Sequence, residues 1–177
     1  MKNTTNQAEN NLCNNLILGM GIAYLLFLVW AILWKCGMPF IGSEAQRTIN
    51  LHPFNNNTSW EMQFNIAVFM PLGFYLAAYK KGWMFMKLAV IIIISFILES
   101  VQFVLAIGRS DITDLVLNTF GGICGVLVFY FISLLFKKRE RMVTIVLCII
   151  LTLFELYMTV SFIVFGYLNL GFMIIRL

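Results

Sequence analysis

Carboxylate, amide and hydroxyl side chains gather at three places in this 177-residue chain, each inside otherwise apolar sequence. They are Glu61 and Asn65 at the first place, Ser95, Glu99 and Gln102 at the second, and Asp111, Asp114 and Asn118 at the third. Neighbouring members of each group are three or four residues apart, so a helix would carry each group on one face. Such side chains can hydrogen-bond a polar ligand, and a positioned carboxylate can also transfer a proton. The pattern therefore favours either a binding site or a general acid–base site.

The composition of the chain indicates the environment of these groups. Hydrophobic residues make up 61% of the sequence and charged residues 11%, and the mean hydropathy is +0.90. Soluble domains are about half apolar and about a quarter charged, and a soluble domain of this size keeps too much surface wet to bury so many apolar side chains. We therefore exclude a soluble enzyme, a disordered protein and a nucleic-acid-binding module. We predict an integral membrane protein whose immediate partner is membrane lipid.

Five apolar stretches come close to the length that a bilayer-crossing helix needs, which is about 20 residues. They cover residues 16–34, 64–79, 83–105, 112–136 and 142–165, and the second is the shortest. A β-barrel is not expected, because no regular alternation between apolar and polar residues is present. The sequence thus predicts an all-α fold, a polytopic membrane helix bundle with about five transmembrane helices.

Polar and basic residues divide the chain and predict its orientation. We expect a polar N-terminal arm at 1–15, a five-helix membrane domain at 16–165 with an outer loop at 36–63, and an apolar tail at 166–177 that either lies at the interface or extends the last helix. Five crossings place Lys2, Lys80, Lys81, Lys87, Lys137, Lys138, Arg139 and Arg141 on one side, and Lys35, Arg47, Arg109 and Arg176 on the other. Because the more basic side usually faces the cytoplasm, the sequence predicts a cytoplasmic N-terminus.

On this topology the three polar groups lie at one depth, near the outer face of the membrane. At about 1.5 Å per residue, Glu99 lies about 9 Å below Leu105, the last residue of its stretch. A carboxylate facing lipid near the bilayer centre would cost about 2.5–3.5 kcal/mol, so the cheaper arrangement turns all three groups toward one wet pocket. The predicted binding residues are Asn65, Glu99, Gln102, Arg109, Asp111, Asp114 and Asn118, with Glu99 and Asp114 as the candidates for catalysis.

Simpler structural roles compete with this site. Asp111 and Asp114 fall in the first turn of the fourth predicted helix, where carboxylates cap free N–H groups and favour the positive end of the helix dipole. Capping explains Asp111 about as well as a site does. Glu99 and Gln102 could instead join neighbouring helices by hydrogen bonds, each a modest contribution to stability.

Two features of the fourth and fifth predicted helices also bear on packing. Gly121 and Gly125 form a Gly-x-x-x-Gly pair, and small residues at this spacing let a neighbouring helix approach closely. Glu155 falls near the middle of the fifth stretch, where it either pairs within the bundle or joins the same pocket. Cys124 and Cys148 lie inside apolar stretches and are expected to be packed thiols.

The order and spacing of the polar motifs resemble the VanZ-like family. The motifs are Asn50-Leu51-x-Pro53-Phe54, Asn65-x-x-x-Phe69-x-Pro71-Leu72-Gly73, Ser95-x-x-x-Glu99-x-x-Gln102 and Asp111-Ile112-x-Asp114-x-x-x-Asn118-Thr119-x-Gly121-x-x-x-Gly125. The resemblance covers residues 50–126, about the middle of the chain. It implies a bacterial cell-membrane protein that lowers susceptibility to teicoplanin, a lipid-tailed glycopeptide antibiotic. It implies no particular reaction.

Three functions are compatible with these residues. In the first, the outward-facing pocket binds an amphiphile, which is teicoplanin or a lipid-linked peptidoglycan precursor. In the second, the protein is a membrane-embedded enzyme that modifies such a precursor, with Glu99 as general base and with Asp111 and Asp114 holding Mg²⁺ against a lipid pyrophosphate. The third is a lipid or drug transporter, which is disfavoured because the chain shows no inverted repeat and no nucleotide-binding motif. We favour binding over catalysis, and we expect no cofactor and no resident metal.

Overall fold

The computed structural model of the chain describes residues 2–34, 46–50, 52, 59–79, 82–105, 107–165, 167–169 and 174–176. Its helices are α1 (Lys2–Trp34), α2 (Ser59–Tyr79), α3 (Met84–Leu105), α4 (Ile112–Leu135) and α5 (Glu140–Phe165). All five are long and apolar enough to cross a membrane. The predicted all-α membrane bundle with five spans is therefore confirmed.

Two helices, α1 and α2, begin before the apolar stretches that the sequence predicts for them. The helix α1 begins at Lys2, so most of the predicted polar arm is helical, although its apolar span covers only Asn10–Leu33. A polar sequence without glycine or proline can extend a helix that has already nucleated, because each added residue gains one backbone hydrogen bond. In the same way α2 begins at Ser59, five residues before the apolar stretch at 64.

The C-terminal tail does not extend the last helix. The helix α5 ends at Phe165, directly before a glycine in the sequence, and glycine commonly follows the last residue of a helix. Beyond it, β3 (Tyr167–Asn169) and β4 (Ile174–Arg176) pair as two antiparallel strands.

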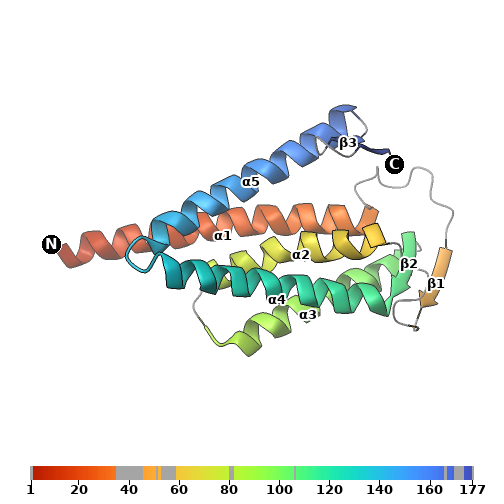
Figure 1. Cartoon of the computed structure of the whole chain (residues 1–177), viewed down its shortest axis with the longest axis horizontal. Coiled ribbons are helices and arrows are strands. Elements are labelled where there is room, and N and C mark those ends of the chain that lie inside the picture. The colour runs from red at the N-terminus through yellow and green to blue at the C-terminus, as the bar shows by residue number, and fades with distance from the viewer. Residues whose placement is uncertain are drawn as a thin grey trace.

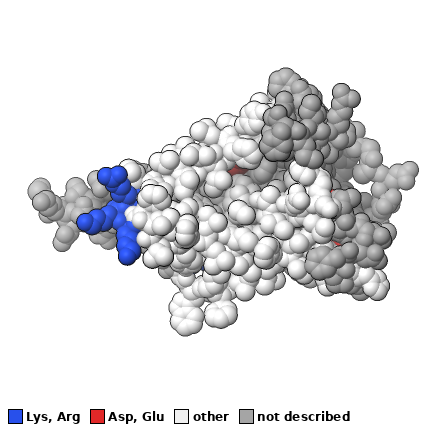
Figure 2. Space-filling model, in the orientation of Figure 1, with Lys and Arg blue, Asp and Glu red and all other residues white. Residues whose placement is uncertain are grey.

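Figure 1 shows how the five helices pack. The helix α2 contacts both α1 and α4, while α3 packs against α4 and α5 packs against α1. The N-terminus and the turn between α4 and α5 lie at one end of the bundle, and Figure 2 shows lysine and arginine side chains gathered there. We call this the basic end, after Lys137, Lys138, Arg139 and Arg141.

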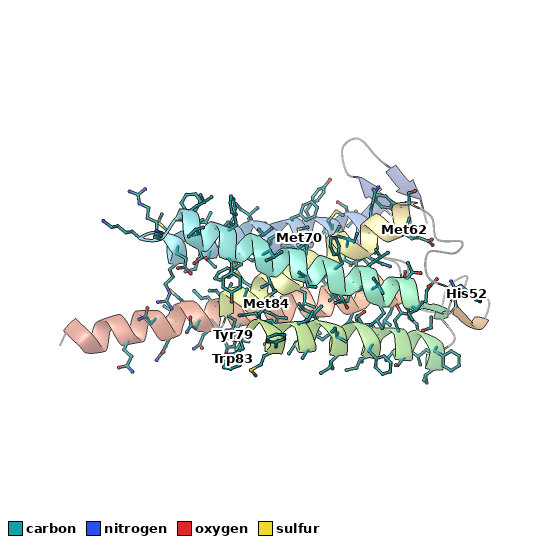
Figure 3. The ribbon with its side chains drawn as sticks, turned by 60° about the horizontal axis from the view of Figure 1, so that its bottom comes forward. His52, Met62, Met70, Tyr79, Trp83 and Met84 are labelled. Carbon is teal, nitrogen blue, oxygen red and sulfur yellow. The ribbon has the colours of Figure 1, made fainter. Side chains whose placement is uncertain are left out.

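Two short strands cover the opposite end, which we call the strand end. The strand β1 (Gln46–Asn50) pairs in parallel with β2 (Ile107–Asp111), and Asn50 stands opposite Asp111 in the register. Figure 3 shows His52 beside these strands, while Tyr79 and Trp83 lie toward the basic end. The sequence does not predict this strand pair, because a parallel pair between distant short segments leaves no local pattern.

The closest helix contact joins α2 to α4 through glycines. A Cβ on Gly121 would overlap the backbone of Ile66, and a Cβ on Gly125 would overlap the carbonyl of Met70. The packing role predicted for Gly121 and Gly125 is therefore confirmed. The same contact also requires Gly73 on α2, because a Cβ there would overlap the carbonyl of Gly122.

Buried aromatic and aliphatic side chains fill the space around this contact. Phe69 on α2 and Phe129 on α4 are among the largest fully buried side chains. Two tyrosines tie neighbouring helices to α2: the Tyr24 hydroxyl donates to the Val68 carbonyl at 2.6 Å, and the Tyr75 hydroxyl donates to the Cys148 carbonyl at 3.0 Å. Cys148 is buried, as expected for a packed thiol, whereas Cys124 is only half-buried.

We predict that Gly125→Ala destabilises the bundle. The added methyl group has no space against the α2 backbone, and forcing extra volume into a packed core costs about 1–3 kcal/mol. Thermal unfolding of the purified protein in detergent measures the effect. Gly19→Ala is the matched control, because a Cβ at Gly19 meets nothing within 4 Å. Equal stability of the two variants would contradict the glycine contact.

Candidate functional site

Glu99 joins the end of α3 to the start of α4. Its side chain is buried, and Oε2 accepts a hydrogen bond from the backbone N–H of Asp111 at 3.0 Å. The same oxygen accepts from the Ser110 hydroxyl at 3.1 Å. One carboxylate oxygen of α3 therefore holds both residues that lead into α4.

Asp111 is the N-cap of α4. Its backbone is extended, with φ −128° and ψ 126°, and Oδ1 accepts from the backbone N–H of Thr113 at 2.9 Å. The other oxygen, Oδ2, accepts from the Asn50 side-chain amide at 2.9 Å. The capping alternative is therefore confirmed for Asp111.

Asn50, the last residue of β1, makes a hydrogen bond to this cap. Its Nδ2 donates to Asp111, while its Oδ1 accepts from the backbone N–H of His52 at 3.1 Å, the local bond that asparagine often makes in turns. The predicted binding set included neither Asn50 nor Ser110. The only sequence signal for Asn50 was its place at the head of the family motif, and Ser110 had none beyond its position next to Asp111.

A second polar contact lies deeper between the same two helices. Asn118 on α4 and Ser95 on α3 are fully buried, and the Asn118 amide donates to the Ser95 hydroxyl at 3.0 Å. Ser95 precedes Glu99 by four residues, so the two lie on one face of α3. Asp114, half-buried on α4, lies close enough to interact electrostatically with Glu99. We call Ser95, Glu99, Asp111, Asp114 and Asn118 the polar cluster.

The other predicted binding residues have different surroundings. Gln102 is buried, and its Nε2 donates to the Ile32 carbonyl of α1 at 2.9 Å, so it joins two helices as the structural alternative predicted. Asn65 is buried on α2, the helix that packs against α4. The backbone of Arg109 lies in β2, but its side chain is outside the described part of the structure. Glu155 is half-buried on α5, the helix that packs against α1.

Two acceptor atoms of the polar cluster have no hydrogen-bond partner among the described residues. They are Oε1 of Glu99 and Oδ1 of Asn118, and both are buried. An unpaired buried polar group costs about 1–3 kcal/mol, so each of these atoms requires a donor. Within the described residues, no group of three or more histidine, cysteine, aspartate and glutamate side chains is arranged to hold a metal ion. The two unpaired acceptors, Glu99 Oε1 and Asn118 Oδ1, can accept hydrogen bonds from a donor-rich group.

Comparison with known proteins gives two matches. The sequence model of a family described as VanZ/LLP1 matches residues 21–136. Protein VanZ of Enterococcus faecium is 34% identical over 148 residues, which cover 80% of this chain and 91% of that protein. No solved structure matches this chain. The family match includes α2, α3 and α4 with the whole polar cluster, and it ends before α5.

We predict that Asp111→Ala weakens the attachment of the strand end. The substitution removes the cap of α4 and the partner of Asn50, and loss of a cap alone costs about 1–2 kcal/mol. Thermal unfolding and hydrogen exchange at the first turn of α4 should both report the loss. Ser100→Ala is the control, because the Ser100 hydroxyl donates to the Phe96 carbonyl of its own helix and not to α4 or the strands within the described residues. An unchanged exchange rate at Thr113 would contradict the capping role.

Proposed function

Because this chain belongs to the VanZ/LLP1 family, we propose that it lowers the susceptibility of a bacterium to teicoplanin by binding an amphiphile at the polar cluster. Membership confirms the resemblance that the sequence motifs indicate. It also agrees with a multi-pass membrane protein, for which five helices are long and apolar enough. The amphiphile is teicoplanin itself or a lipid-linked peptidoglycan precursor, and its binding would keep the drug from accumulating at its target.

The unpaired acceptors Glu99 Oε1 and Asn118 Oδ1 are the observation that carries this proposal. A glycopeptide and a peptidoglycan precursor both carry hydroxyl and amide N–H donors, which would satisfy these atoms. The site therefore suits the sugar or peptide part of the ligand.

Binding is preferred to the enzymatic alternative because of what Asp111 already does. Both of its carboxylate oxygens accept hydrogen bonds from the protein, one from Thr113 and one from Asn50. Each oxygen keeps one further lone pair, so Mg²⁺ could approach Asp111 only along the directions that these two bonds leave open. Magnesium ions favour carboxylate oxygens that are free to meet strict octahedral geometry.

The proposed orientation places the strand end outside the bacterial cell membrane. The basic end then faces the cytoplasm, as the clustering of Lys137, Lys138, Arg139 and Arg141 favours (Figure 2). Teicoplanin and the lipid-linked precursor meet at the outer face, so this orientation brings the polar cluster to the side where its ligand would be. The N-terminus of α1 is cytoplasmic in this arrangement.

We predict that the wild-type chain, produced in a susceptible Gram-positive host, protects against teicoplanin and not against vancomycin. Glu99→Gln should abolish protection while leaving the fold intact. The single carbonyl of glutamine can keep the bonds from Ser110 and Asp111, but its amide turns the unpaired acceptor Oε1 into a donor. Loss of a hydrogen bond to a charged group weakens binding by about tenfold or more. Asp114→Asn should also abolish protection, with the protein still present in the membrane.

Glu155→Gln is the matched control for this experiment. Glu155 also has a buried carboxylate oxygen without a partner among the described residues, but it lies on α5, outside the family match. It should protect as the wild type does. Full protection by both Glu99→Gln and Asp114→Asn would show that the cluster is only scaffold. A new or missing lipid-linked species in lipid extracts of the host would favour the enzymatic alternative.

We predict that the two ends of the bundle label from opposite sides of the membrane. In a variant without the native cysteines, His52→Cys should react with a membrane-impermeant maleimide in intact cells, because His52 is exposed at the strand end. Arg139→Cys at the basic end should react only after permeabilisation. Labelling of Arg139→Cys in intact cells would reverse the orientation and place the polar cluster on the cytoplasmic side.

A further inference from the structure

A cavity lies at the basic end, far from the polar cluster. It encloses about 480 Å³ between α1, the end of α2 and the turn from α4 into α5. Its polar lining includes Asn14, Tyr79, Lys137, Lys138, Arg141 and Thr144. Because these residues come from α1, α2, α5 and the turn before α5, and Phe129 of α4 also lines the space, the cavity exists only in the assembled bundle.

One buried polar group that lines this cavity has no hydrogen-bond partner among the described residues. Thr144 is 3% exposed, and its hydroxyl oxygen makes no hydrogen bond with any described residue. A threonine hydroxyl is both a donor and an acceptor, so it can bond an oxygen of a ligand. A buried group of this kind, lining a cavity, points to a ligand in a way that surface lysines alone do not.

The cavity is also positively charged. Lys137, Lys138 and Arg141 line it together with Glu140, which gives a formal charge of three minus one, or +2. Arg141 is held in position by α1, because its guanidinium donates to the Asn10 carbonyl at 2.9 Å and to the Asn14 side chain at 3.0 Å. The helix α5 begins at Glu140, so the positive end of its dipole adds to the same field. These features favour an anion.

An apolar groove adjoins the cavity and suggests the rest of the ligand. It is lined by Leu134, Leu135, Phe136, Lys137, Lys138 and Arg139, so it shares two lysines with the cavity. Leu134 is 65% exposed and Leu135 is 59% exposed, as lipid-facing side chains are in a membrane helix. Basic residues immediately beyond an apolar helix end are suited to the headgroups of anionic lipids. An amphiphile with an acyl chain along α4 and a phosphate over the lysines would contact both surfaces.

We propose that the basic end binds an anionic phospholipid, with its headgroup phosphate in the cavity between α1, α2, α4 and α5. The phosphate oxygens accept from the lysines and from the Thr144 hydroxyl, and an acyl chain lies along Leu134 and Leu135. This site is independent of the function proposed for the polar cluster. The bound lipid fastens the turn between α4 and α5 to α1.

The test uses the purified full-length protein in a neutral detergent, with phosphatidylglycerol, phosphatidylcholine and inorganic phosphate as three separate additions. Phosphatidylglycerol should raise the unfolding temperature, while phosphatidylcholine and inorganic phosphate at equal concentration should leave it unchanged. Native mass spectrometry should show one phosphatidylglycerol retained. A shift with phosphatidylcholine of the same size would show a general detergent–lipid effect. An equal shift with inorganic phosphate would show a free anion site. Either result would overturn the proposal.

Three variants distinguish a specific lipid site from non-specific electrostatic attraction between basic residues and anionic lipid. Lys138→Gln should weaken phosphatidylglycerol binding about fivefold, the effect of one basic residue near an anionic headgroup. Arg139→Gln removes the same charge from the same turn. Arg139 lines only the groove and not the cavity that holds the phosphate, so this variant should have a smaller effect. Equal losses in both variants would overturn the proposal.

Thr144→Val gives the sharpest readout. Replacing an unpaired buried hydroxyl with a methyl group of similar shape should not lower the stability of the lipid-free protein. It should nevertheless reduce the shift produced by phosphatidylglycerol. If Thr144→Val responds to phosphatidylglycerol as the wild type does, the hydroxyl does not contact the lipid and the proposed site is wrong.

Discussion

A polar group inside a bilayer has to find its hydrogen-bond partner within the protein, because hydrocarbon offers none. This constraint determines which faces of α3 and α4 meet. Glu99 bonds the backbone at the start of α4, and Asn118 bonds Ser95 deeper between the same helices. The apolar side chains on the opposite face of α3, such as Ile93 and Ile97, are exposed on the outside of the bundle. The orientation of α3 in the bundle therefore follows from its polar residues more than from its hydrophobic ones.

The glycine contact between α2 and α4 holds two helices together by close packing and not by hydrogen bonds. Lipid chains are as apolar as leucine, so burying leucine between two membrane helices gains little, and close backbone packing has to supply the attraction. Gly73, Gly121 and Gly125 make that approach possible. The contact begins one turn below Asn118 on α4, so a tightly packed region supports the polar cluster from beneath. A site above such a support keeps its geometry without help from a large soluble domain.

Different parts of the structure were predictable to different degrees, for physical reasons. The five spans were predictable because hydrocarbon thickness fixes their length and composition, and the face shared by Asp111, Asp114 and Asn118 followed from helical spacing. The hydrogen bond from Gln102 to α1 was not predictable, because the spacing of residues within α3 does not indicate which helix packs against that face. The side-chain hydrogen bond between Asn50 and Asp111 joins residues that are 61 positions apart in the sequence. No local pattern marks such a pair, and only the family motif singled out Asn50.

The pairing of β1 with β2 also imposes an order of assembly on the molecule. Ribosomes deliver the chain from its N-terminus, so β1 exists long before its partner, and α2 and α3 must both cross the bilayer between them. Asn50 cannot meet Asp111, and Glu99 cannot receive its backbone donor, until that second crossing is complete. The carboxylate of Glu99 thus enters the membrane before its hydrogen-bond donors, the Ser110 hydroxyl and the backbone N–H of Asp111, are in place. The strand end therefore stays incomplete until late in synthesis, and it is completed when α4 packs against α3.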